Sequence, residues 1–312
     1  MYVGAFARLA RDRFYREPRR LGRAAWSFFS SLPGQIQLFR VFSLPAFKGM
    51  VLSDPVFPFR HLSRYFLLPG LNAKARTACL LHHYRFFIGR MPKVHLRRVA
   101  LLEHESNGRT FSVIIGPPDA NAPMEGELVL QLLVDATPVY HLQFTIIPGS
   151  LVHSEQRHVI LVQRLQGAKG CFEQVSTATK AFADVAPPLL LLTVLEGAAA
   201  AWGIHEMACV SAQSQASCRL SIAEGSAAVF AEAYDDFFVR LGARRVCTDY
   251  FSLPLPIADK PIELIGNGHK ARTRRKRAFR HDLANRVCQR ILEASWPETA
   301  PGVLPKPVTT AV

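Results

Sequence analysis

The segment from residue 127 to residue 147 constrains the fold more than any other part of the chain. Two apolar runs, 127–134 and 139–147, flank the turn-forming residues DATP at 135–138. In the second run apolar and polar side chains alternate, as they do in a strand that buries one face. The pattern predicts an antiparallel hairpin. The β-branched run at 158–165 predicts a third strand beside it.

Helical and strand patterns surround this hairpin. Before it, the spacing of apolar residues predicts a helix at 73–91 and a short strand at 111–116. After it, the pattern predicts helices at 172–185, 188–202, 226–241 and 269–294, with strands at 204–211 and 245–253. Pro188, Gly203 and Gly242 fit the expected helix ends. We therefore predict an α/β fold with a mixed, largely antiparallel sheet and flanking helices.

Composition divides the chain into three parts. Residues 1–75 combine a basic helical pattern at 5–30 with a segment broken by prolines, which predicts a basic, helical or irregular N-terminal region. Residues 76–294 hold the predicted α/β domain, and a hydrophobic content of 49% is enough for a large core. The tail at 295–312, rich in Pro, Thr and Val, is predicted to be disordered.

The net charge of +14 is concentrated in two patches. Residues 1–23 carry seven arginines against two acidic residues, and residues 269–280 carry seven basic residues and no acid. Such patches bind polyanions, so an anionic membrane surface or another polyanion is the candidate partner, with a solvated helix as the alternative for each patch. Nucleic acid is the weaker alternative, because no aromatic residues interleave at stacking intervals. The anion-binding candidates are Lys270, Arg272, Arg274, Arg275, Lys276, Arg277 and Arg280.

Neither a secretory signal nor a membrane span is predicted. Arginines at positions 8, 11, 13 and 16 lie where the apolar core of a signal would be. The longest apolar stretch, 187–204, begins with two prolines and contains Glu196, which makes it too short and too interrupted for a bilayer span. Six scattered cysteines without a CxxC pair indicate reduced thiols. The expected location is the cytoplasm.

Nine segments carry a family resemblance. Between about Leu80 and Glu293 the chain reads, in order, HHYRFF, APMEGELVLQLL, VYHLQFTI, VQRLQG, ATK, APPLLLLTVLEGAAAAWGI, AYDDFFVRLGA, DYFSLPL and KARTRRKR. Together they resemble the VirK/YbjX family of Gram-negative bacteria, for which no biochemical activity is assigned. Its members are linked to virulence, envelope integrity and resistance to cationic antimicrobial peptides. The resemblance implies such a role here. The basic segments add peripheral contact at the inner membrane as an alternative to a purely cytoplasmic location.

Two short segments depart from that family. Residues 210–213, VSAQ, lack the Asn associated with this place, and residues 247–250, CTDY, replace what looks like an Asp-Gly-Phe turn.

The order of predicted elements is also similar to that of the GNAT acyltransferases. In those enzymes the turn after the fourth strand offers backbone amides and a helix N-terminus to the pyrophosphate of coenzyme A. The resemblance implies a coenzyme A thioester as cofactor, bound after the strand at 158–165. The cofactor-binding candidates are Arg164, Gln166, Gly167, Ala168, Lys169 and Gly170. Lys169 stands where a small residue is expected, although a lysine can contact phosphate as a cation. In the alternative, the glycines only permit a turn.

The catalytic candidate is Tyr234. Many GNAT enzymes protonate the departing coenzyme A with a Tyr four residues before the glycine that ends the helix, and here Phe238 occupies that position. Tyr234 lies one turn earlier on the same helix face and is the implied substitute, unless it is only a core anchor. Because Phe238 has no proton to donate, the second hypothesis is a non-catalytic protein that binds anionic surfaces through its basic segments.

The remaining acidic residues and histidines give weaker signals. Adjacent residues on a helix point about 100° apart, so Asp235 and Asp236 are not predicted to form a dyad. Glu125 and Glu127 have strand spacing, and a general base or metal site is weighed there against the default of exposed hairpin charge. The pair His82-His83 has no second cluster at ligand spacing, so no metal site is predicted.

Overall fold

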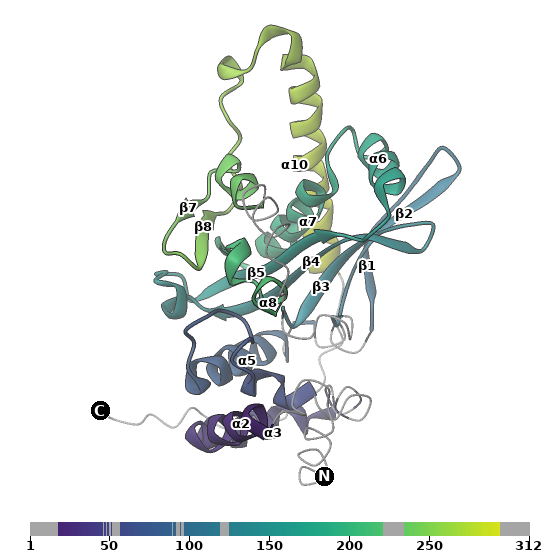
Figure 1. The fold of residues 1–312 in the computed structure, drawn as a ribbon. Coiled ribbons are helices and arrows are strands. Elements are labelled where there is room, and N and C mark those ends of the chain that lie inside the picture. The colour runs from purple at the N-terminus through teal and green to yellow at the C-terminus, as the bar shows by residue number, and fades with distance from the viewer. Residues whose placement is uncertain are drawn as a thin grey trace.

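A computed structural model describes residues 18–45, 47, 49, 51, 57–88, 90–91, 94, 97–118, 125–220 and 234–293. Its centre is an eight-stranded sheet of order β1-β2-β3-β4-β5-β6-β8-β7 (Figure 1). Neighbouring strands are antiparallel except β5 and β6, which are parallel. The strands are β1 (Val99–Ser106), β2 (Arg109–Gly116), β3 (Leu128–Val134), β4 (Thr137–Pro148), β5 (His158–Gly167), β6 (Glu206–Val210), β7 (Arg244–Arg245) and β8 (Tyr250–Pro254).

Helices cover both faces of the sheet (Figure 1). On one face lie α6 (Phe172–Ala181), α7 (Pro187–Trp202) and the long α10 (Lys270–Glu293). A Cβ at Gly197 of α7 would come within 2.4 Å of the carbonyl oxygen of Ala284, so glycine is what lets α7 and α10 pack closely. On the other face lie α5 (Ala73–Ile88), α3 (Leu32–Phe42) and α2 (Pro18–Ser30).

The central strands of the sheet have no solvent-exposed face. In β5, Ile160 and Val162 belong to the core under α7, while Val159 and Leu161 belong to the core under α5. Successive strand residues point to opposite faces, so a strand covered on both sides reads as a continuous apolar run. This explains why residues 158–165 show β-branched residues without clean alternation.

The predicted hairpin is confirmed, with a tighter turn than expected. The strands β3 and β4 are joined by Asp135 and Ala136 alone, with φ of 48° and 63°. Two left-handed residues match the right-handed twist of the strands that they join. The α/β class and the mixed, largely antiparallel sheet are likewise confirmed.

Two strand predictions were incomplete. Strand β1 was not predicted, since its second half alternates charged and polar residues at the sheet edge. The single strand expected at 245–253 is wrong: residues 246–249 form a turn between β7 and β8. The helix at 226–241 is described from residue 234 to 240, and Gly242 ends it with φ of 92°.

Other expectations lie outside the described residues, namely the N-terminal half of the basic helix at 5–30 and the tail at 295–312. The division of the chain at residue 75 stays a prediction. None of the described helices has the length and apolar character needed to cross a lipid bilayer.

Candidate functional site at the divergence of β5 and β6

The parallel strands β5 and β6 stay together for only three residues. Their paired positions are 160–162 of β5 and 207–209 of β6, after which β5 continues to Gly167 beside β4 alone. On the β4 side, Gln143 pairs with Arg164 and Phe144 with Val162, so Gln163 is an extra residue. A bulge of this kind bends its strand. The carboxyl ends of β5 and β6 therefore diverge.

Glu125 connects the two diverging ends. Its carboxylate accepts hydrogen bonds from Arg164 Nη1 of β5 at 3.0 Å and from the Ser217 backbone N–H at 2.7 Å. Ser217 lies in α8 (Ala216–Leu220), which follows β6. Arg164 Nε also donates to Gln166 Oε1 at 2.9 Å. The buried carboxylate thus orients Arg164, which in turn bonds to Gln166, and both belong to the predicted cofactor-binding residues.

Glu127 belongs to a second, deeper set of contacts. The hydroxyl of Tyr84 donates to its Oε2, and Arg60 Nη2 lies 3.8 Å from the same oxygen. Burial raises the pKa of Glu127, and Arg60 and then the Tyr84 hydrogen bond oppose the rise. The default expectation of exposed hairpin charge is wrong for both glutamates, which are 4% and 1% exposed.

Gly126 allows this burial. Its φ of 140° lies in the region that favours glycine, and a Cβ would come within 2.8 Å of the Phe144 nitrogen. A larger residue here would push Glu125 and Glu127 away from β4.

Gln163, at the bulge, has a buried side chain with an unsatisfied hydrogen-bond donor. Its Oε1 accepts from the Thr145 hydroxyl at 3.0 Å, while its Nε2 has no partner among the described residues. Buried donors are nearly always satisfied, so an unpaired one at the point of divergence fits a missing ligand. The sequence pattern did not single out Gln163, although the polar pair Gln163-Arg164 inside a β-branched run was a usable signal.

Tyr234 lies at the same point of divergence. Burial raises its pKa well above the usual value, and the Cys209 thiol, Glu125, Asp235 and Tyr140 add to the rise. The phenol therefore keeps its proton at neutral pH. Glu125 is thus within electrostatic range of this catalytic candidate, which sequence spacing did not reveal.

The predicted pyrophosphate cradle is partly available. The Ala168 amide already donates to the Val139 carbonyl at 2.9 Å, and Gly167 lies against the ring of Tyr140. Among the residues that the structure describes, the amides of Lys169 and Gly170 have no acceptor. Both residues are exposed at the turn that enters α6.

The basic run on α10 is partly neutralised within the chain. Asp184 pairs with Arg272 at 3.0 Å and with Arg275 at 3.3 Å. Asp259 pairs with Arg280 at 3.0 Å and lies 3.5 Å from Arg277. Four of the seven predicted anion-binding residues are therefore engaged, and Lys270, Arg274 and Lys276 have no ion pair within the described part of the chain.

The prediction for Asp235 and Asp236 is confirmed. Asp235 accepts from the Ala212 amide at 2.9 Å and pairs with Arg245 at 2.9 Å, while Asp236 pairs with Arg240 at 3.4 Å. The two carboxylates thus serve different partners. No group of three metal-ligating side chains occurs in the described ranges.

Fold and site together define an α/β protein with a buried polar cluster where a parallel strand pair diverges. A family model described as "Protein of unknown function (DUF535)" matches residues 31–289. The chain belongs to this family, which is the family of the VirK/YbjX proteins, so the predicted kinship is confirmed at that level. No curated protein and no solved structure matches the chain.

Proposed function

We propose that the protein is an acyltransferase that takes its acyl group from a coenzyme A thioester bound where β5 and β6 diverge. The observation that carries the proposal is the divergence itself, with Gln163 at the bulge, Arg164 bonded to Glu125, and Tyr234 near enough to Glu125 and Cys209 for both to raise its pKa. Where a helix connects two parallel strands, ligands bind beyond the carboxyl ends of those strands. The connection from β5 through α6 and α7 to β6 is of this kind, and it supports the GNAT-like resemblance.

Each residue has a chemical task in this proposal. The thioester supplies an activated acyl group. The free Nε2 of Gln163 is a donor suited to the acyl carbonyl oxygen, where negative charge develops. The Tyr234 hydroxyl holds a proton for the departing sulfur. Arg164, with the free amides of Lys169 and Gly170, offers donors to phosphate.

Ligand-induced stabilisation tests the binding step. A ligand at 100 times its Kd stabilises the native state by about 2.7 kcal/mol, so acetyl-coenzyme A should raise the unfolding midpoint. Lys169→Gln should reduce this shift, whereas Lys180→Gln, exposed at the other end of α6, should keep it. An unchanged midpoint at millimolar acetyl-coenzyme A removes the proposal.

Tyr234→Phe tests the chemical step. Loss of a positioned proton donor lowers a rate by about 10²–10⁴-fold. We expect the variant to keep the acetyl-coenzyme A shift and to lose hydrolysis of the thioester and transfer to amine acceptors. A variant with the wild-type rate would leave Tyr234 as a core anchor only.

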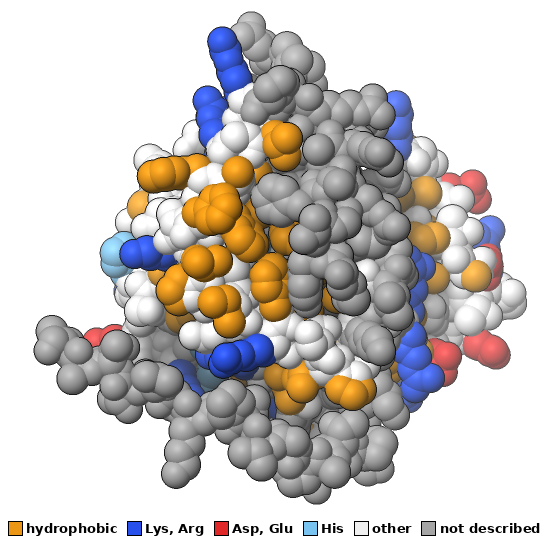
Figure 2. Space-filling view, turned by 90° about the horizontal axis from the view of Figure 1, so that it is seen from below, with side chains coloured by type: hydrophobic (Ala, Val, Ile, Leu, Met, Phe, Trp, Pro, Cys, Tyr) orange, Lys and Arg blue, Asp and Glu red, His pale blue; other side chains and the backbone are white. Residues whose placement is uncertain are grey.

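A second candidate function is attachment to an anionic membrane surface, and one surface supports it. We define the α2–α3 face by its exposed apolar residues Trp26, Phe29, Leu32 and Ile36 and its arginines Arg19, Arg23 and Arg40. Figure 2 looks onto this side of the molecule and shows hydrophobic side chains in open view. Trp26 is 77% exposed and Phe29 is 69% exposed.

The composition of the α2–α3 face suits lipid. Aromatic and aliphatic side chains with an arginine rim are typical of helices that lie in the membrane interface. Co-sedimentation with phosphatidylglycerol vesicles should fall in Trp26→Ser/Phe29→Ser. It should be unaffected in Phe172→Ser, which removes a comparably exposed aromatic residue from α6. Equal binding by all three proteins would argue against this face.

A further inference from the structure

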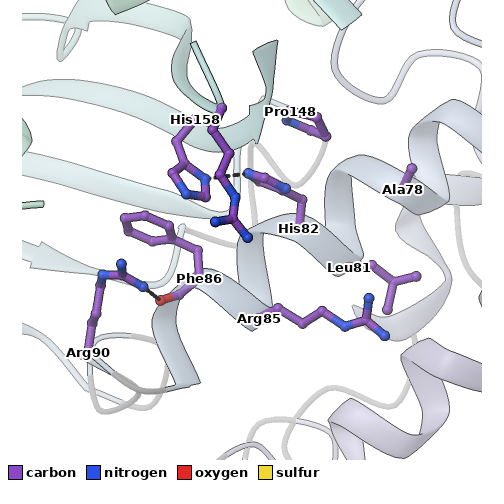
Figure 3. Close-up of a pocket in the computed structure, with 9 residues that line it drawn as sticks. Ala78, Leu81, His82, Arg85, Phe86, Arg90, Pro148 and His158 are labelled. Atoms are coloured by element: carbon purple, nitrogen blue, oxygen red, sulfur yellow. Dashed lines mark hydrogen bonds between the residues drawn. The ribbon is translucent and has the colours of Figure 1, made fainter. Parts of the chain in front are cut away.

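A second polar site lies at the other end of β5. A pocket of about 420 Å³ opens between α5 and the adjacent ends of β4 and β5 (Figure 3). It is lined by Ala78, Leu81, His82, Arg85, Phe86, Arg90, Pro148, Arg157 and His158. Residue 158 begins β5 and residue 167 ends it, so the pocket lies about 30 Å from the far end of β5 at about 3.3 Å per residue. The pocket is thus separate from the proposed acyl-transfer site.

Every ionisable side chain that lines this pocket is basic. We call the three arginines and two histidines, residues 82, 85, 90, 157 and 158, the arginine–histidine pocket. His82 Nε2 and His158 Nδ1 share a hydrogen bond of 2.8 Å. Arg90 donates to the Phe86 carbonyl at 2.9 Å and stacks over the Phe86 ring at 4.1 Å. Arg85, at the rim, donates to Gln37 Oε1 of α3 at 2.8 Å.

Among the described residues, no carboxylate lies within ion-pair distance of these cations. Within the described ranges of the chain, none of Arg85, Arg90 and Arg157 has an ion-pair partner, and the Arg157 guanidinium has no hydrogen-bond acceptor. Such a cluster contrasts with α10, where Asp184 and Asp259 each hold two arginines. An unpaired guanidinium beside other cations leaves its donors for an anion from outside the chain.

The charges in the pocket repel one another. Burial, together with the charges of His158, Arg157 and Arg85, lowers the pKa of His82 to about 4. Burial also lowers the pKa of His158 and of Arg90, again with a contribution from Arg157. Like charges held together without a counter-ion cost free energy, and a bound anion would remove that cost.

The geometry selects the class of anion. Guanidinium groups bind tetrahedral oxyanions through paired N–H donors, and imidazole N–H groups add further donors. Figure 3 shows His82, Phe86 and Arg90 projecting from the α5 side toward His158 on the strand. Donors from two sides suit a phosphate, which offers oxygens in several directions.

We propose that the arginine–histidine pocket binds a phosphate group, carried by a soluble phosphate compound or by a lipid headgroup. Arg90, Arg157 and His158 supply the donors, and Phe86 holds Arg90 in place by stacking. This site does not depend on the acyl-transfer proposal.

The first experiment uses inorganic phosphate. The purified protein is titrated with phosphate at constant ionic strength against chloride, with the unfolding midpoint and calorimetric heat as readouts. Phosphate should bind the wild-type protein, and Arg157→Gln and His158→Gln should each weaken binding by about tenfold or more. Lys74→Gln removes a positive charge from α5 at a position outside the pocket, and this variant should bind like wild type.

The second experiment separates the two sources of phosphate. Vesicles of phosphatidylcholine are compared with vesicles that contain phosphatidic acid, using the same four proteins. Soluble phosphate binding that the pocket variants lose supports a soluble ligand. Binding only to phosphatidic acid vesicles, lost in the same variants, supports a lipid headgroup. If neither probe binds, or if Arg157→Gln binds both like wild type, the proposal is overturned. Circular dichroism confirms that the variants remain folded.

Discussion

Two groups of arginines in this protein have opposite surroundings. On α10, Arg272 and Arg275 share Asp184, and Arg277 and Arg280 lie at Asp259. In the arginine–histidine pocket, Arg85, Arg90 and Arg157 meet no carboxylate within the described residues. The densest basic run in the sequence is therefore partly neutralised, whereas scattered residues create an unneutralised site. Charge density along a chain does not tell where positive potential is available.

The largest effect is expected at the most buried cation of α10. Arg280 is 8% exposed and pairs with Asp259, and its Nε donates to Thr193 Oγ1 at 3.4 Å. Arg280→Met should lower the free energy of unfolding by about 2 kcal/mol, less than for a fully buried pair because Asp259 keeps Arg277. Urea denaturation measures the loss. Arg274→Met, exposed on the same helix, should stay within about 0.5 kcal/mol of wild type.

The second effect is a pH dependence that belongs to the pocket. His82 has a pKa of about 4 in the folded state and an ordinary pKa near 6.5 when unfolded. As the pH falls, the unfolded chain therefore binds a proton before the folded chain does. The free energy of unfolding decreases as the pH falls from 6.5 toward 4. Buried His61, with a pKa of about 3, adds a loss of the same sign. The difference between wild type and His82→Gln isolates the contribution of His82.

We expect the unfolding midpoint to fall less in His82→Gln than in wild type between pH 7 and pH 4.5, in chloride. Sulfate keeps its charge over this range, and it should reduce the fall in wild type by neutralising Arg85 and Arg157 around His82. His205→Gln, which replaces an exposed histidine, is the control. Identical curves for all three proteins would show that the pocket carries no linked charge.

The smallest expected effect is a change in the free energy of unfolding that has opposite signs for the pocket arginines and the α10 arginines. In chloride, Arg157→Gln should stabilise the protein by about 0.5 kcal/mol or less, because it relieves repulsion without breaking an ion pair. Arg272→Gln should destabilise it by a similar amount, because it removes a surface partner of Asp184. Both differences should shrink in high salt. Destabilisation by Arg157→Gln in chloride would mean that the pocket cations are already neutralised.

Local patterns predicted the framework of the fold well. The β3–β4 hairpin, α7 and its cap at Gly203, with φ of 67°, follow from residue periodicity and backbone preference. Strand β1 was not predicted, because the second half of this edge strand is exposed to solvent and lacks the alternation of apolar and polar residues. The turn between β7 and β8 was not predicted, because apolar residues lie directly before and after it and the stretch reads as one strand.

The site was predictable only in pieces. The sequence indicated the turn after β5 and named Tyr234 from the GNAT resemblance. It did not indicate that Glu125 bonds to Arg164 and is near enough to Tyr234 to raise its pKa. Two glutamates at strand spacing are predicted to be exposed to solvent when the residues that contact them are not known. Those partners, Ser217 and Tyr84, lie 92 and 43 residues from the glutamates that they contact.

The sequence by itself determined the order of helices and strands and the family to which the chain belongs, because periodicity, turn residues and motif order are properties of neighbouring residues. Only the tertiary structure decided which charges are neutralised and which remain available. His82 and His158 are 76 residues apart in the chain and 2.8 Å apart in space. Electrostatic interaction depends on that spatial distance and on burial, and the folded chain alone fixes both.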